Sequence, residues 1–313
     1  MKILITGISG FLGSRLSELL KNRSFDVSGT SRNGDVARNI YATGNIDGQT
    51  DWGKIVSGCD VVIHAAGRAH ILHETMADVV AEFNKVNCDA TLKLAADAEA
   101  AGVKQFIFIS SIGVNGENSQ QKAISEKSTP NPVSPYAISK YEAEKKLLAT
   151  YADSPMAITV IRPALICGPG APGNIERLLK LVASGLPLPF KNVSNVRSMA
   201  SLDNICDFII HCINSPLARN QTFVFSDEIE LSIEEIASAM AAGMGKKARL
   251  IAFPPSILKL LLTLCGKKKI YEQLFGTLTI DATKSRDYMK WQPVITIQDS
   301  LFAAGQAYRE GKK

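Results

Sequence analysis

The sequence predicts an α/β protein with a doubly wound parallel sheet and a smaller α/β C-terminal domain. Short apolar runs alternate with helical patterns along the first half of the chain, as they do where helices cover both faces of a parallel sheet. The first apolar run ends at a glycine-rich turn, and a helical pattern starts at that turn. Strand, glycine turn and helix in this order are typical of a Rossmann-type dinucleotide fold.

The first strand is predicted over residues 2–6, and glycines follow it with the spacing G-x-x-G-x-x-G at Gly7, Gly10 and Gly13. Glycines let the backbone approach a pyrophosphate closely, and the N-terminus of the following helix faces its negative charge. The spacing differs from the commoner G-x-G-x-x-G, but its place between a strand and a helix strengthens the prediction. The residues predicted to hold a dinucleotide here are Gly7, Ser9, Gly10, Phe11 and Leu12.

The second strand is predicted over residues 25–30, and Ser31 and Arg32 follow it. NAD-binding proteins usually place an acidic residue at this point, on the adenosine ribose. A serine and an arginine instead favour the additional phosphate of NADP(H), with NAD as the alternative cofactor. In another interpretation, Arg32 is a solvated loop residue. Asn45 and Ile46, in the loop that follows, are also predicted to bind the cofactor.

Buried strands are predicted over residues 59–64 and 105–109, with a long amphipathic helix of about 76–101 between them. The first of these strands ends in small residues that let a cofactor lie close. The second ends in two serines at the carboxyl edge of the sheet, where open α/β sheets bind ligands. Cofactor contacts are therefore predicted from Ala65, Ala66, Gly67, Asn87 and Ser110.

Residues 134–140, with the sequence Ser-Pro-Tyr-Ala-Ile-Ser-Lys, begin a further predicted helix. Ser134 is the expected N-cap, with proline in the first turn. Tyr136 and Lys140 are four residues apart and share one helix face. A lysine cation and a helix N-terminus both favour the phenolate, so we expect the pKa of Tyr136 to be lowered toward neutral pH. The same Tyr-x-x-x-Lys pattern at Tyr141 and Tyr308 lacks this context.

The next strand is predicted over residues 157–161, with Arg162 and Pro163 at its end, and 119–132 is expected to form a loop over the site. After Gly168 the alternation of strands and helices stops. Residues 174–184 read as a helix, and Ser232 to Glu235 form a capping box. We predict a dinucleotide-binding domain of residues 1–165 plus about 195–225, and a second, substrate-binding domain of residues 166–194 and 226–313.

Residues 257–262 are apolar and helical in pattern, and three lysines follow at 267–269. Such a segment either touches a membrane surface or packs as a helix with a solvated basic end, and the packed helix is favoured. No apolar run is long enough to predict stable membrane insertion.

Composition and charge argue against nucleic-acid binding and against a metal site. A net charge of +5 is mild, and no basic run with interleaved aromatic residues predicts nucleic-acid binding. The six cysteines show no spacing typical of a metal site, so reduced thiols, no metal and a cytoplasmic protein are expected. The N-terminus shows no signal-peptide pattern.

Taken together, these motifs resemble the extended short-chain dehydrogenase/reductase family, in its UDP-glucose 4-epimerase-like (NAD-dependent epimerase/dehydratase) branch. The resemblance covers nearly the whole chain. It rests on the glycine turn with Thr6, and on the segments 60–66 (Asp-Val-Val-Ile-His-Ala-Ala), 110–111, 136–140, 162–163, 197–204 and 291–293.

The resemblance implies roles for individual residues. Ser111, Tyr136 and Lys140 correspond to the catalytic set, in which the lysine also holds the nicotinamide ribose beside Pro163. Asn174 and Arg197 correspond to residues that hold the nucleotide diphosphate. The sugar contacts implied are Ser111, Val114, Asn115, Tyr136 and Pro189. Leu278 falls where stricter glucose and galactose enzymes have a tyrosine, which leaves room for a 2-acetamido group.

The function implied is NAD(P)-dependent redox chemistry at C4 of a nucleotide-activated hexose. The chain looks most similar to reductases of UDP-4-keto-6-deoxy-N-acetylhexosamines from bacterial surface-polysaccharide pathways. One alternative is a 4-epimerase of UDP-glucose or UDP-N-acetylglucosamine, and another is a non-catalytic dinucleotide-binding sensor or assembly protein. Relatives also imply a homodimer through the helices near 76–101 and 136–151, where Leu147, Leu148 and Tyr151 could form the contact.

Overall fold

The computed structural model describes residues 1–68, 76–119, 122–264, 266 and 268–311. Its main sheet has seven parallel strands in the order β10-β6-β5-β4-β1-β2-β3. The bounds are β1 Lys2–Thr6, β2 Asp26–Ser31, β3 Ile40–Ala42, β4 Val61–His64, β5 Gln105–Ile109, β6 Ala157–Pro163 and β10 Gln221–Phe225. This confirms the predicted α/β fold.

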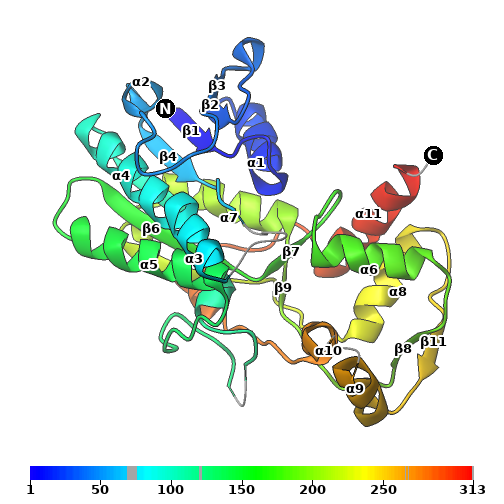
Figure 1. Ribbon diagram of the computed structural model, residues 1–313. Helices are drawn as coiled ribbons and strands as arrows, with labels where there is room; N and C mark the ends of the chain where they lie inside the picture. Colours follow the sequence, from blue (N-terminus) through cyan, green and yellow to red (C-terminus); the bar gives the residue numbers. More distant parts are fainter. Residues whose placement is uncertain (69–75, 120–121, 265, 267, 312–313) are drawn as a thin grey trace.

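Helices cover both faces of this sheet (Figure 1). Side chains alternate along each strand, so β1 sends Ile3 and Ile5 into one core and Leu4 into the other. The first core packs against α1 (Phe11–Asn22) and α7 (Leu202–Asn214), and the second against α2 (Gly53–Val56), α4 (Ala90–Ala100) and α5 (Pro135–Thr150).

The predicted helix of 76–101 is interrupted by a wider turn. It runs as α3 (Met76–Asn84), a π-helical turn (Lys85–Asp89) and α4. A π-helical turn holds an extra residue and frequently marks a functional site. Asn87 lies in this turn and is fully buried.

A second lobe follows β6 and has its own hydrophobic core. Two parallel pairs, β7 (Leu165–Cys167) with β9 (Met199–Ser201) and β8 (Leu188–Lys191) with β11 (Leu250–Ala252), are accompanied by several helices. These are α6 (Asn174–Ala183), α8 (Ile233–Gly243), α9 (Pro255–Leu264), α10 (Lys268–Phe275) and α11 (Ile297–Glu310). Short 3₁₀ turns span Val36–Arg38, Ile112–Val114 and Pro216–Ala218, and a second π-helical turn spans Lys284–Tyr288. The division into domains stays a prediction.

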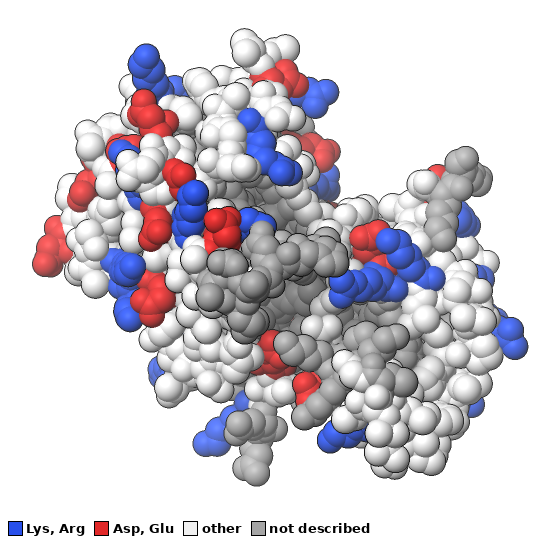
Figure 2. Space-filling model, in the orientation of Figure 1, with Lys and Arg blue, Asp and Glu red and all other residues white. Residues whose placement is uncertain are grey.

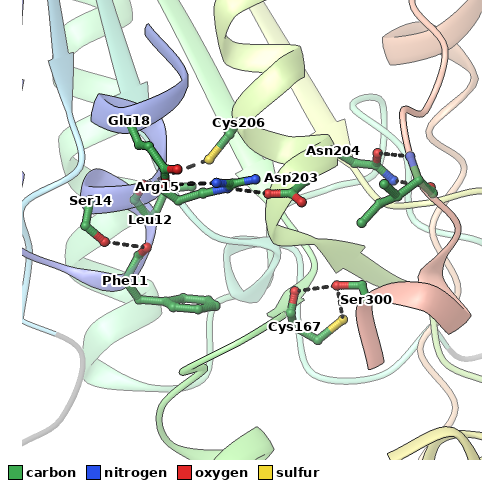
Figure 3. Close-up of polar contacts among 11 residues, drawn as sticks. Phe11, Leu12, Ser14, Arg15, Glu18, Cys167, Asp203, Asn204, Cys206 and Ser300 are labelled. Carbon is green, nitrogen blue, oxygen red and sulfur yellow. Dashed lines mark hydrogen bonds and ion pairs between the residues drawn. The ribbon is translucent and has the colours of Figure 1, made fainter. Parts of the chain in front are cut away.

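Polar contacts tie neighbouring elements together near the junction of the two lobes (Figure 3). Arg15 on α1 donates from Nε to Oδ1 of Asp203 on α7 at 2.6 Å. Asn204, the next residue, accepts from the backbone N–H of Val294 at 2.9 Å. On the other side of the junction, Ser300 Oγ on α11 donates to the carbonyl oxygen of Cys167 on β7 at 3.0 Å. Phe11, at the start of α1, packs against the hydrophobic cores of both lobes.

The structure bears on three further expectations, which concern the 257–262 helix, the dimer contact and the cysteines. The helix expected to pack at 257–262 is α9, and none of its residues is buried. Leu147 and Tyr151 are buried in the core, so they are not available for a dimer contact, whereas Leu148 is exposed. Five cysteines are free and buried, as expected of core thiols, and Cys265 lies outside the described residues. Within the described part of the chain, no helix has the length and apolarity needed to cross a bilayer.

Candidate active site

A cavity of about 490 Å³ lies at the carboxyl ends of the central strands and reaches the second lobe. Many residues predicted from the sequence line it. From the cofactor and catalytic sets these are Phe11, Ala65, Gly67, Ser110, Ser111, Tyr136, Lys140 and Pro163, and from the substrate set Asn174 and Arg197. Leu278 is part of the same wall. The cavity therefore joins the two predicted sets in one space.

The beginning of α5 positions Tyr136. Ser134 is the N-cap, and its hydroxyl accepts from the backbone N–H of Ala137 at 3.2 Å, with Pro135 in the first turn. A buried ion pair fixes the same helix to β6, because Arg162 donates from Nε to Glu144 Oε1 at 3.0 Å. Tyr136 also packs edge-on against Phe83 of α3, with ring centroids 6.1 Å apart.

Lys140 lies one turn further along α5 and is almost completely buried. Its ammonium donates to the carbonyl oxygen of Ile109 at 2.9 Å and lies 4.6 Å from the ring centroid of Phe108. Burial lowers the pKa of Lys140 to about 8, and Glu144 opposes this shift. The amino group thus titrates close to neutral pH.

Burial shifts the pKa of Tyr136 in the opposite direction to that expected from the sequence. The ring borders the cavity, but the surrounding protein raises the pKa of the phenol to about 12, and a hydrogen bond with Ser111 only partly opposes this. Desolvation is the largest cause of this shift, and the Lys140 ammonium donates to the Ile109 carbonyl. The expected lowering is therefore wrong for the protein alone.

Ser111 follows β5 and starts the short 3₁₀ turn of Ile112–Val114. Its hydroxyl oxygen accepts from the backbone N–H of Gly113 at 3.1 Å. The residue therefore caps the end of the strand and still reaches Tyr136 through its hydroxyl. Beside it, the Ser110 hydroxyl is buried, lines the cavity and has no hydrogen-bond partner among the described residues.

The glycine turn fits a dinucleotide pyrophosphate. Gly7 has a φ of +68°, and a Cβ there would lie 2.9 Å from the Cα of Ala66. A Cβ on Gly13 would lie 2.3 Å from the carbonyl oxygen of Gly7. No side chain caps the N-terminus of α1, and Ser9 and Gly10 are exposed there. Close backbone packing and an uncapped helix N-terminus are what a phosphate requires.

A buried hydrogen-bond network behind this cradle was not predicted from the sequence. Thr91 Oγ1 donates to the Asn87 carbonyl at 2.8 Å and lies 2.9 Å from His64 Nε2. Since the Thr91 proton is used, His64 Nε2 must donate to it, and His64 Nδ1 accepts from Thr6 Oγ1 at 2.6 Å. Burial lowers the pKa of His64 to about 3, so this ring is neutral.

Asn87 connects the network to the catalytic helix. Its side-chain oxygen accepts from the Arg68 backbone N–H at 2.8 Å, and its amide donates to Ser139 Oγ at 3.1 Å. Ser139 in turn donates to the carbonyl oxygen of Tyr136 at 2.8 Å.

The backbone after β4 packs closely on the same network. A Cβ on Gly67 would lie 3.2 Å from the Asn87 side-chain oxygen. Ala66 also enters the network, because its N–H donates to Thr6 Oγ1 at 3.2 Å.

The adenosine end of the predicted site lies outside this cavity. Ser31 ends β2, and its hydroxyl accepts from the Gly34 N–H at 3.0 Å. Arg32 and Asn45 are exposed, and Ile46 packs partly against the second core. Because β2 lies beside β1, Ser31 and Arg32 stand next to the glycine turn.

Three of the predicted sugar contacts do not line the cavity. Val114 is fully buried, and Pro189 lies in β8. Asn115 is turned away, because its side-chain oxygen accepts from Arg162 Nη1 at 3.1 Å and its amide donates to the Ser128 carbonyl at 3.1 Å. The 3₁₀ turn after Ser111 causes this rotation. The wall contains instead Glu117, Asn118, Glu272 and Gln273, which have no distinctive sequence pattern.

Arg197 crosses the substrate side of the cavity. Its Nη1 donates to the carbonyl oxygens of Gln273 at 2.8 Å and Gly276 at 3.0 Å. Burial lowers the pKa of this guanidinium. Asn174, the first residue of α6, lies at the same end of the cavity. A buried cation that donates its hydrogen bonds to neutral carbonyl oxygens can bind an anionic ligand favourably. Among the described residues, no group of His, Cys, Asp and Glu side chains could hold a metal ion.

Comparisons with known proteins agree with this arrangement. A family model described as the NAD dependent epimerase/dehydratase family matches residues 3–224. A UDP-glucose 4-epimerase of Vibrio cholerae is 35% identical over 311 residues, which is 98% of this chain and 95% of that protein. An Escherichia coli O157:H7 protein, N-acetyl-alpha-D-glucosaminyl-diphospho-ditrans,octacis-undecaprenol 4-epimerase, is 28% identical over 248 residues, 78% of this chain and 73% of that protein.

Solved structures show the same fold. The Thermotoga maritima UDP-glucose 4-epimerase with UDP-glucose superposes with a TM-score of 0.78, at 22% identity, over 100% of both chains. The UDP-N-acetylglucosamine 4-epimerase of Bacillus cereus gives a TM-score of 0.79, at 17% identity, over 99% of both chains.

Proposed function

Because this chain belongs to the NAD dependent epimerase/dehydratase family of short-chain dehydrogenase/reductase enzymes, we propose that it interconverts the C4 epimers of a UDP-linked hexose. The observation that carries the proposal is the grouping of Ser111, Tyr136 and Lys140 in one cavity, between the glycine cradle and Arg197. The full-length similarity to the Vibrio cholerae epimerase supports this mode of C4 chemistry.

In the proposed reaction, Ser111 hydrogen-bonds the C4 oxygen of the sugar, and Tyr136 in its phenolate form takes the hydroxyl proton. The electron pair of the C4–H bond leaves as hydride, and bound NAD(P) supplies its acceptor. The resulting ketone turns its other face and takes the same hydride back, while Tyr136 returns the proton. Tyr136 ionises more readily beside positive charge, which Lys140 and an oxidised nicotinamide ring would provide.

The residues proposed to hold the substrate are Arg197 and Asn174 for the diphosphate, with Leu278 beside the sugar. The Arg197 guanidinium would exchange its carbonyl partners for charge-assisted bonds to phosphate oxygens. Leu278 has less bulk than a tyrosine, so an N-acetylated hexose is the preferred substrate in this proposal.

The test is to incubate the purified protein, without added cofactor, with UDP-glucose and with UDP-N-acetylglucosamine. Proton NMR of the anomeric signals should show the C4 epimer of at least one substrate. The Tyr136→Phe variant should give none under the same conditions. A protein that interconverts no UDP-hexose pair, even with NAD⁺ or NADP⁺ added, is not an epimerase.

A second candidate, reduction of a UDP-4-keto-6-deoxy-N-acetylhexosamine by NADPH, is favoured by Arg32. Its exposed cation follows β2, where a 2′-phosphate would lie and where a tightly held NAD would usually meet a carboxylate. A reductase should consume one NADPH for each ketone reduced. Arg32→Ala should then raise KM for NADPH and leave KM for NADH unchanged. Equal losses for both cofactors would remove the argument for NADP(H).

A further inference from the structure

Helix α9 carries an apolar face that no part of the described chain covers. Its exposed residues are spaced at i, i+3, i+4 and i+7, so they form one stripe. They are Ile257, Leu260, Leu261 and Leu264, with exposed fractions of 48%, 60%, 49% and 76%. Single exposed apolar residues are ordinary on protein surfaces, but four on one face of one helix are not.

The rest of the helix is arranged as in an interfacial helix. Leu258 and Leu262 are half-buried and lie together on a different side. Ser256, Lys259 and Thr263 form the polar side, and Thr263 donates to the Lys259 carbonyl at 2.7 Å. An exposed apolar face beside a face with a lysine is the pattern of a helix that lies in a membrane surface.

The chain segment that contains α9 carries basic residues and no acidic ones, and the first acidic residue after it is Glu272 of α10. The sequence from Ile236 to Tyr271 contains no Asp or Glu. In Figure 2 the part of the second lobe where Figure 1 places α9 and β11 is mostly white, with some blue. The basic residues of this stretch in the sequence are Lys246, Lys247, Arg249, Lys259, Lys267, Lys268 and Lys269.

This charge distinguishes among the surfaces that could cover α9. In a two-fold symmetric dimer the same patch meets itself, so basic groups would face basic groups. Nucleic acid would match the charge but would gain little from four aliphatic side chains, since bases stack on aromatic rings. An anionic lipid surface satisfies both features, because headgroups attract the basic residues and the acyl region accepts the leucines.

We propose that α9 docks this enzyme peripherally on anionic lipid bilayers. Docking would also orient the active site, because α9 packs on α10, and Glu272 and Gln273 of α10 line the cavity. The cavity then lies on the side of the molecule close to the lipid. This surface is independent of the proposed function, since none of its residues lines the cavity.

The test is sedimentation of the full-length protein with vesicles. Vesicles that mix phosphatidylethanolamine and phosphatidylglycerol should bind it about tenfold or more tightly than phosphatidylcholine vesicles at low salt, since each lysine near the surface contributes roughly 1 kcal/mol. Leu260→Gln/Leu264→Gln should weaken binding at least about tenfold, because it removes two apolar side chains from the lipid. Lys259→Gln should weaken it about fivefold, and only at low salt.

The matched control is Val36→Gln/Phe302→Gln, which removes two exposed apolar residues elsewhere on the surface and should leave vesicle binding unchanged. Turnover with a soluble nucleotide sugar should be the same in all these variants, which shows that they are folded. Equal binding to both vesicle types, or undiminished binding by the α9 variant, would overturn the proposal. So would concentration-dependent self-association that the α9 variant abolishes, because a second copy would then cover α9.

Discussion

Tyr136 and Lys140 lie one helical turn apart, and burial moves their pKa values away from each other, the phenol up to about 12 and the ammonium down to about 8, because it disfavours the charged form of each group. The phenol is held neutral and the ammonium is brought close to losing its proton. A positively charged ligand beside Tyr136 would favour its phenolate form. The proton transfer proposed for Tyr136 therefore depends on the charges around its hydroxyl as well as on its position.

Replacing Tyr136 with Phe should lower kcat by about 10²–10⁴-fold, the usual contribution of a positioned proton-transfer group. Only the hydroxyl is lost, and the ring contact with Phe83 is kept. Dinucleotide affinity, measured by fluorescence titration, should therefore change little. Tyr141→Phe is the matched control on the same helix and should be nearly silent. If Tyr141→Phe is the inactive variant, the helix face has been assigned incorrectly.

The pKa of Lys140 predicts a pH dependence of stability. The folded protein loses this proton near pH 8, whereas the unfolded chain keeps it to about 10.5. Between these values the unfolded state binds more protons, so the free energy of unfolding rises with pH. Between a pH well below 8 and pH 10.5, the free energy of unfolding from urea titrations should rise by on the order of 3 kcal/mol. The Lys140→Met variant should lack this rise. An identical pH dependence of the unfolding free energy in the two proteins would contradict the pKa shift assigned to Lys140.

At the scale of elements, β1, β4, α4 and α5 are held together by the network of Thr6, His64, Thr91, Asn87 and Ser139. The network sets the distance between the glycine cradle and Tyr136, because it starts beside Gly7 and ends at the Tyr136 carbonyl.

Thr91→Val should test the network with almost no change in shape. It leaves the His64 Nε2–H and the Asn87 carbonyl buried without their hydroxyl partner, which should cost about 1–3 kcal/mol in unfolding free energy. Thr91→Ser keeps the hydroxyl and should cost less than Thr91→Val in the same urea titrations. If Thr91→Val costs less than Thr91→Ser, the methyl group and not the hydrogen bonds stabilises the protein at this position.

The sequence was sufficient where a local pattern determines the structure. Strands β1, β4, β5 and β6 inside the sheet were predicted because they are largely apolar runs, and the shared face of Tyr136 and Lys140 follows from helix geometry. β3 has three residues at the sheet edge and is largely exposed, so it has no such run. The position of Asn115 depends on a partner 47 residues away, Arg162, and the walls contributed by α10 depend on the second lobe.

At the scale of the whole molecule, the two proposed ligand sites belong to different lobes. The glycine cradle is part of the seven-stranded sheet, and Arg197 lies in the second lobe beside α10. A nucleotide diphosphate alone should therefore stabilise the protein without a dinucleotide.

UDP at about 100 times its Kd should stabilise the folded state by about 2.7 kcal/mol and raise Tm. Arg197→Ala should need much more UDP for the same shift, since a lost charge-assisted pair costs on the order of 2–3 kcal/mol. Arg38→Ala, at a surface arginine of the first lobe, should respond to UDP as the unmodified protein does. A UDP-induced shift in Tm that is unaffected by Arg197→Ala would place the diphosphate elsewhere.

The π-helical turn of Lys85–Asp89 has a consequence for changes in chain length. Deleting one residue inside it would remove the extra residue and allow a regular α-helix, with the side chains on both sides of the deletion on nearly their present faces. α3 and α4 both pack against α5, and both contacts could then be kept. The same deletion within α4 would instead turn the side chains before it by about 100° relative to those after it, so this helix should tolerate a single-residue gap at the π-helical turn and not beyond it.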